Sequence, residues 1–79
     1  MMYVYILKSD EDCSIYVGVS SDLRNRLDAH NKGSVSHTRK HRPWHIAWYC
    51  AFVEKQKAFE FEKYLKQGTG RAHIHKRLL

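Results

Sequence analysis

The sequence predicts an α+β fold: a small three-stranded antiparallel sheet flanked by helices, in the order β-β-α-β-α-α. Two stretches rich in aromatic and β-branched residues, joined by a short polar segment, indicate a hairpin at the start of the chain. A helical pattern follows, and a third strand-like stretch precedes two further helical patterns. Because the chain has 79 residues and no internal repeat, we expect a single domain over residues 1–79.

The two strands of the hairpin are expected at residues 3–7 and 15–19. The first is an almost continuous aromatic and β-branched run, which is typical of a strand buried on both faces. Residues 9–12 are polar and supply the turn.

The central helix is expected at residues 22–31. Its start is indicated by Ser20, Ser21 and Asp22, whose side-chain oxygens can accept hydrogen bonds from the amides of the first turn. Its end is indicated by Gly33, a suitable C-terminal cap.

The central helix is expected to carry an arginine and a histidine at the rim of its buried stripe. Leu23 and Leu27 are one turn apart and define the stripe. At about 100° per residue, Arg26 and His30 project within roughly 60° of it, whereas Arg24 points towards water. An arginine that only confers solubility belongs on the outer face, so the position of Arg26 suggests chemistry.

The second half of the chain predicts one strand and two helices. Residues 34–43 form a basic loop that ends at Pro43, and residues 44–53 have the pattern of a third strand. A helix is expected at residues 55–67, with an apolar side formed by Ala58, Phe61 and Leu65.

Residues 68–70 should break this helix. Thr69 or Gly70 would then cap a short last helix at residues 71–78.

Composition narrows the class of function. The formal charge of +6 and the isoelectric point near 9.6 favour a polyanionic partner such as nucleic acid. Two cysteines without a CxxC pattern suggest reduced thiols, and we see neither a signal-peptide pattern nor a bilayer-spanning apolar run. We therefore expect a cytoplasmic protein that binds no membrane; the sequence does not indicate its oligomeric state.

Three side chains invite a functional and a structural interpretation. Glu62 projects about 40° from Ala58, at the edge of the apolar stripe, where it can pair with a lysine, Lys63 or Lys66, or help to complete an octahedral Mg²⁺ site. Tyr5 and Tyr16 lie in neighbouring predicted strands, where tyrosines usually serve packing.

Three histidines, His37, His41 and His45, are spaced at four residues, as ligands on a helix would be. Pro43 and the polar composition argue against a helix there, and no pair of thiols supports a zinc site. We do not expect these histidines to bind a metal.

Basic residues recur along the chain and predict contacts with phosphates, although a solvated surface is the simpler interpretation of any one of them. The residues assigned to nucleic-acid binding are Lys8, Arg24, Arg39, Lys40, Arg42, Lys66 and Arg71.

Taken together, these residues resemble the GIY-YIG nuclease domain. Residues 3–7 contain the first tripeptide motif, residues 16–18 contain the second, and an arginine, a histidine and a glutamate follow at suitable spacings. Residues 62–72 are similar to small stand-alone bacterial members. Tyr3 replaces the first glycine of the motif, and no asparagine follows the glutamate.

The resemblance implies a metal-dependent endonuclease that hydrolyses phosphodiester bonds in nucleic acid, with DNA as the expected substrate. It implies that Tyr5 is the general base, that Tyr16 is the second-motif tyrosine and that Arg26 stabilises phosphoryl charge. His30 would be the hydrogen-bond partner or a substitute base, and Glu62 would bind one Mg²⁺ or Mn²⁺ ion.

Two other functions remain open from sequence. The domain can be a nucleic-acid-binding module that keeps the fold with weak or no catalysis, or an adaptor that binds proteins. A metal-dependent cleavage assay separates the endonuclease from the binding module, and salt-dependent DNA binding separates both of these from the adaptor.

Overall fold

The computed structural model describes residues 1–79 and has the predicted order of elements. The strands are β1 (Met2–Ser9), β2 (Ile15–Ser20) and β3 (Trp44–Phe52). The helices are α1 (Leu23–Lys32), α2 (Lys55–Leu65) and α3 (Gly68–His73), with a short 3₁₀ turn η1 (Arg39–His41) and a final π-helical stretch η2 (Ile74–Leu78). None of the helices has the length and the apolar character that a membrane-spanning segment needs.

The strands form one antiparallel sheet in the order β2-β1-β3, so that β1 is central and β2 is an edge strand. Tyr5 pairs with Gly18 of β2 on one side and with Tyr49 of β3 on the other. The α+β prediction is confirmed.

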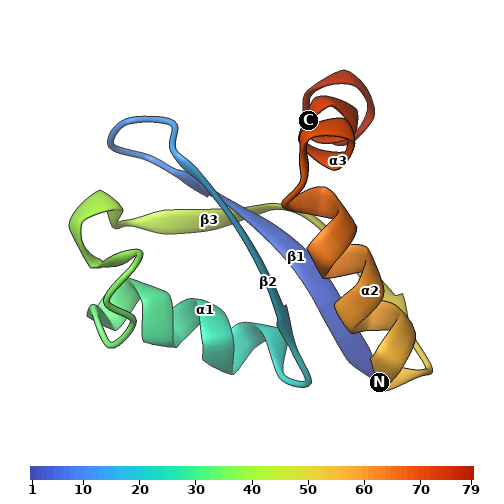
Figure 1. Ribbon diagram of the computed structural model, residues 1–79. Coiled ribbons are helices and arrows are strands. Elements are labelled where there is room, and N and C mark those ends of the chain that lie inside the picture. Colours follow the sequence, from blue (N-terminus) through green and yellow to red (C-terminus); the bar gives the residue numbers. More distant parts are fainter.

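The sheet separates two hydrophobic clusters. Alternation along β1 directs Val4 and Ile6 to one face, where they pack with residues of α2 and η2. Tyr5 and Leu7 point to the other face, where the leucines of α1 pack against them. Helices α1 and α2 therefore cover opposite faces of the sheet, and Figure 1 shows them on either side of β1 and β2.

An irregularity in the ladder lets β3 contribute to both clusters. Ile6 pairs with Trp48, but Leu7 pairs with Ile46, so β3 has one extra residue at this point. As a result Trp44 and Ile46 face α1, whereas Trp48 packs on the side of α2.

The caps of α1 explain its bounds. The Asp22 carboxylate accepts a hydrogen bond from the Asn25 amide at 3.0 Å, and Gly33 adopts a left-handed conformation with φ of 82°. The cap is therefore Asp22 alone of the three expected residues, because Ser20 instead accepts a hydrogen bond from the Asp22 amide.

The prediction for the last helix was wrong about its start. α3 begins at Gly68, with Gln67 in the N-cap position, so residues 68–70 are its first turn rather than a break. The reason is the close approach of this turn to the end of α2: a Cβ at Gly70 would lie 1.8 Å from the Tyr64 carbonyl oxygen. Only glycine allows the chain to begin a new helix there.

Candidate active site

The candidate site is centred on Tyr5, which is 1% exposed despite its polar hydroxyl. Its ring crosses the neighbouring strand over Gly18, where an added Cβ would lie 2.4 Å from the Tyr5 hydroxyl oxygen. The glycine of the second motif thus provides the space through which the Tyr5 side chain reaches α1. There the hydroxyl lies 3.0 Å from Nε2 of His30.

His30 is fully buried, and both of its ring nitrogens have partners. Nε2 faces Tyr5, and Nδ1 lies 2.7 Å from Oγ1 of Thr38, which is also buried. Thr38 can donate its hydroxyl proton to the Val35 carbonyl at 3.4 Å. In that arrangement Nδ1–H donates to Thr38, and Nε2 is left as the acceptor for the Tyr5 hydroxyl.

The protonation states agree with this orientation. Burial, together with the nearby charge of Arg26, lowers the pKa of His30 to about 4, so the imidazole is neutral at pH 7. Burial also raises the pKa of Tyr5 above its ordinary value, although the nearby Arg26 guanidinium acts in the opposite direction. At neutral pH the site therefore holds a phenol next to an imidazole.

Tyr16 completes a group of three rings. Its ring centroid is 4.9 Å from that of His30 and 6.4 Å from that of Tyr5. From the other side of the sheet, the Lys66 ammonium lies 5.7 Å from the centroid of the Tyr16 ring. Tyr16 therefore lies between Lys66, at the end of α2, and the rings of Tyr5 and His30.

Arg26 and Glu62 belong to helices on opposite faces of the sheet, α1 and α2. The charges of both nevertheless act on the pKa of Tyr5. The two helices flank the edge strand β2 from opposite faces of the sheet, so the candidate residues lie around this edge and not on one face.

Glu62 is paired in this structure. Its carboxylate lies 3.1 Å from the Lys66 ammonium and is 20% exposed. Glu62 thus forms the ion pair with a lysine that the structural interpretation predicts. No group of three or more histidine, cysteine or acidic side chains is arranged to hold a metal ion. A lone carboxylate still suits Mg²⁺, which commonly uses one or two carboxylates, water and substrate phosphate oxygens.

Two of the three regularly spaced histidines stabilise the hairpin turn. His41 Nδ1 lies 2.5 Å from the Asp12 carboxylate, and His45 Nδ1 lies 2.7 Å from that of Asp10. These pairs fasten the turn between β1 and β2 to η1 and the start of β3.

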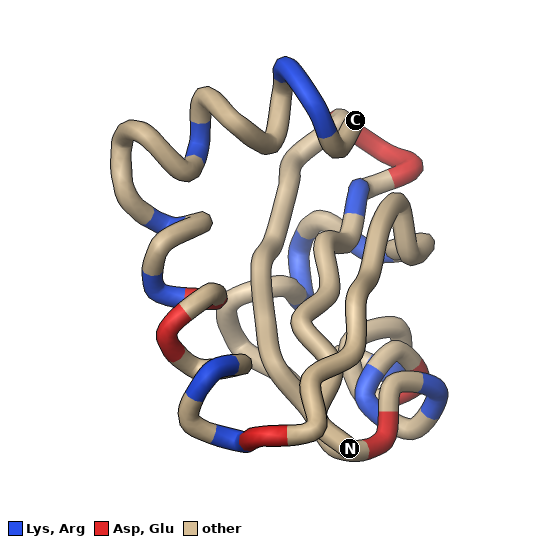
Figure 2. Tube along the Cα trace, turned by 90° about the vertical axis from the view of Figure 1, so that its right-hand side faces the viewer, with Lys and Arg blue, Asp and Glu red and all other residues tan.

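The residues predicted to bind nucleic acid do not form one patch. Figure 2 shows Lys and Arg on several parts of the trace, interspersed with acidic residues. Arg24 and Lys40 are exposed on separate elements, and Lys8 is half-buried in β1. Arg39 donates to the Gly33 carbonyl at 2.9 Å, and Arg42 lies so close to Gly33 that a Cβ there would meet it.

The last two predicted cations, Lys66 and Arg71, lie at the end of α2 and on α3, beside Tyr16.

Two polar residues that no sequence pattern indicates, Thr38 and Asn31, support the site. Thr38 fixes His30 and is itself held by Trp44, whose indole N–H donates to the Thr38 carbonyl at 2.9 Å. The Asn31 side chain accepts a hydrogen bond from the Trp44 amide at 2.6 Å and donates to the Trp44 carbonyl at 3.1 Å. A hydroxyl in a basic loop and an asparagine near a helix end have no distinctive pattern in a single sequence.

Comparison with known proteins gives a consistent match along the chain. The model of the GIY-YIG catalytic domain matches residues 1–76. UPF0213 protein SAG0778 of Streptococcus agalactiae is 34% identical over 73 residues, which are 91% of this chain and 82% of the relative. UPF0213 protein CPE1444 of Clostridium perfringens is 37% identical over 70 residues, which are 87% of this chain and 74% of the relative.

A solved structure is similar as well. The solution NMR structure of UPF0213 protein BH0048 from Bacillus halodurans aligns with a TM-score of 0.58 and 31% identity, covering 95% of this chain and 81% of that protein.

Proposed function

This chain belongs to the GIY-YIG catalytic domain family, a family of nuclease domains, and we propose that it is an endonuclease that hydrolyses phosphodiester bonds in DNA with the aid of a divalent metal ion. The observation that carries the proposal is the buried hydrogen bond of 3.0 Å between the Tyr5 hydroxyl and His30 Nε2. A buried phenol beside a neutral imidazole can pass its own proton to the imidazole while it accepts one from water, so the pair can serve as a general base.

Tyr5 is the base that takes a proton from the attacking water. Because burial raises its pKa, Tyr5 is a phenol at rest and must release its own proton as it accepts one. His30 Nε2 receives that proton, and the hydroxide formed attacks the phosphorus as the bond to the leaving oxygen breaks. The low pKa of His30 depends in part on the charge of Arg26, so a phosphate that neutralises Arg26 makes His30 a better acceptor.

Arg26 stabilises the negative charge that develops on the phosphoryl oxygens. It is half-buried on α1, and its charge already acts on Tyr5, so a phosphate that contacts Arg26 lies beside the proposed base. Partial burial strengthens such a contact, because the effective dielectric constant there is lower than in water.

Glu62 is the residue that would hold Mg²⁺ or Mn²⁺. For this the Lys66 ammonium must leave the carboxylate, and a substrate phosphate next to the pair can draw it away. The bound ion would act as a Lewis acid towards the leaving oxygen.

A plasmid-nicking time course with and without Mg²⁺ tests the proposal. Glu62→Gln should lower the rate roughly 100-fold or more. Glu60→Gln is the matched control, because Glu60 lies on the same helix but is exposed. Folding of both variants is checked by circular dichroism. Equal rates for the two variants would refute the role of Glu62.

The second candidate is a nucleic-acid-binding module without strong catalysis. The ion pair between Glu62 and Lys66 favours it, since this pair occupies the only carboxylate proposed for the metal. Salt-dependent binding of DNA without Mg²⁺-dependent nicking would decide for this candidate.

A further inference from the structure

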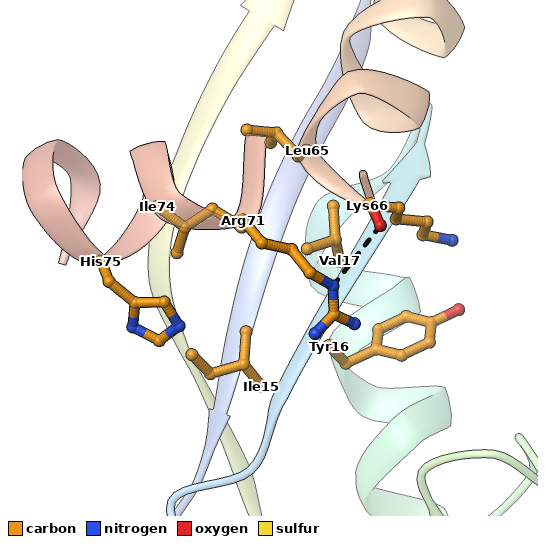
Figure 3. A pocket seen from close by; sticks show the side chains of 8 residues that line it. All are labelled: Ile15, Tyr16, Val17, Leu65, Lys66, Arg71, Ile74 and His75. Atoms are coloured by element: carbon orange, nitrogen blue, oxygen red, sulfur yellow. Dashed lines mark hydrogen bonds between the residues drawn. The ribbon is translucent and has the colours of Figure 1, made fainter. Parts of the chain in front are cut away.

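A cavity of about 200 Å³ lies beside the candidate site, between the edge strand β2 and the C-terminal helices. Its floor is apolar and is formed by side chains from β2, α2 and η2, among them Ile15, Val17 and Ile74. Figure 3 shows Arg71 reaching from α3 across the cavity towards Tyr16, and the ring of His75 directed towards Ile15.

All the ionisable side chains of the lining other than Tyr16 are basic: Lys66, Arg71 and His75. Arg71 forms no ion pair, and its single hydrogen bond, from Nε to the Lys66 carbonyl at 3.4 Å, leaves the terminal guanidinium nitrogens free. Lys66 is paired with Glu62, so the cavity combines an apolar floor with the unpaired positive charge of Arg71. This lining matches a ligand that has a flat or apolar part and an anionic part.

We propose that this cavity binds one unpaired nucleotide of the substrate, with the base over Ile15 and Ile74 and a phosphate at Arg71. The inference rests on the proposed function and specifies its substrate as nucleic acid with an unpaired segment next to the cleavage position. A phosphate alone would make no contact with the apolar floor, and a purely apolar ligand would leave the guanidinium of Arg71 without a partner. A guanidinium plane also stacks well on a base.

The position of the cavity relates it to cleavage. Tyr16 lines the cavity, and the same ring lies 4.9 Å from His30, centroid to centroid. A nucleotide in the cavity is thus a direct neighbour of the phosphate at Tyr5. In a duplex the base is paired and stacked, and it must be extruded before it can enter such a cavity, whereas an unpaired base enters without that cost.

The test is a titration of the ¹⁵N-labelled protein, 9.4 kDa, with thymidine 5′-monophosphate, followed by amide chemical shifts. Saturable shifts are expected at Ile15, Val17 and Ile74, and inorganic phosphate should not reproduce them. Arg71→Gln should weaken the binding of the nucleotide about tenfold, which corresponds to 1.4 kcal/mol. Arg77→Gln is the matched control, because it removes the same charge from the same end of the chain without touching the cavity.

The possible outcomes are distinct. Equal shifts with inorganic phosphate, no localised shifts, or equal losses in the two variants would overturn the proposal. Should Arg71→Gln fail to fold, His75→Gln, at an exposed residue of the lining, takes its place. Failure of the proposed function looks different: nucleotide binding would persist in wild type and in Glu62→Gln while no nicking is seen.

Discussion

The Tyr5 hydroxyl and Nε2 of His30 lie 3.0 Å apart, and the side chains are 1% and 0% exposed. They come from the central strand and from α1, 25 residues apart in sequence. Their contact depends on three conditions that the structure meets together: free space above Gly18, a fixed orientation of the imidazole, and a neutral imidazole. Each condition gives a separate prediction.

The space above Gly18 is tested by Gly18→Ala. An added Cβ would lie 2.4 Å from the Tyr5 oxygen, so Tyr5 must move and lose its bond to His30. We expect a loss of about 1–3 kcal/mol in the free energy of unfolding and a severe loss of nicking. Gly68→Ala is the control, because nothing lies within 4 Å of a Cβ there, and unfolding in urea should show no loss of stability. Nicking by Gly18→Ala at the parent rate would contradict this role of the glycine.

The orientation of His30 is tested by Thr38→Val, which removes the partner of Nδ1 with little change of shape. The buried Nδ1–H then has no acceptor, and stability should fall by about 1–3 kcal/mol. Nicking should fall too, and ¹⁵N shifts of the imidazole should report loss of the tautomer protonated on Nδ1. Thr38→Ser should restore both, since it keeps the hydroxyl. An unchanged tautomer in Thr38→Val would show that Thr38 does not orient the ring.

The neutral imidazole predicts how stability depends on pH. The folded pKa of His30 is lowered from 6.5 to about 4, so between these values the unfolded chain binds a proton that the folded protein does not. This contribution to stability is fully present above about pH 6.5 and is lost as the pH falls towards 4, by up to about 3 kcal/mol.

Urea unfolding at pH 7, 5.5 and 4.5 measures this dependence. His30→Gln is the comparison because its side chain does not titrate, and it should show a flatter profile. Hydrogen bonds from Ser14 and His41 lower the pKa of Asp12, but that effect falls below this window. Parallel profiles for the two proteins would contradict the assignment.

Sequence sufficed for the fold, because the period of the apolar residues changes between strand and helix at each junction. It also placed Leu23 on the inner side of α1 and the half-buried Arg26 at the rim, because helical geometry fixes which residues share a face, whereas His30 was expected at the rim and is fully buried. It could not show that α1 and α2 lie on opposite faces of the sheet. Short strands buried on both faces carry no signal for which helix covers which side.

Contacts that depend on tertiary structure could not be predicted from the sequence either. The pairing of Thr38 with His30 and the start of α3 at Gly68 both arise from close approaches between segments. Single-residue patterns indicate a glycine as a breaker, whereas here Gly70 permits a contact between two consecutive helices.

The role of Arg26 is tested by Arg26→Ala against Arg24→Ala. The two arginines lie on the same helix, and each substitution removes one positive charge, so any general weakening of DNA binding should be similar. Of the two, only Arg26 is half-buried, and its charge lowers the pKa values of Tyr5 and His30. Its loss should lower the nicking rate roughly 100-fold or more, because the phosphoryl charge is no longer stabilised.

Arg26→Ala should also raise the pKa of His30, since the Arg26 charge is one of the two causes that hold it down. Titration of the His30 ring by NMR measures this shift without reference to catalysis, and Arg24→Ala should leave it in place. If Arg26→Ala is folded, nicks DNA as fast as Arg24→Ala and leaves the His30 titration unchanged, Arg26 does not belong to the site.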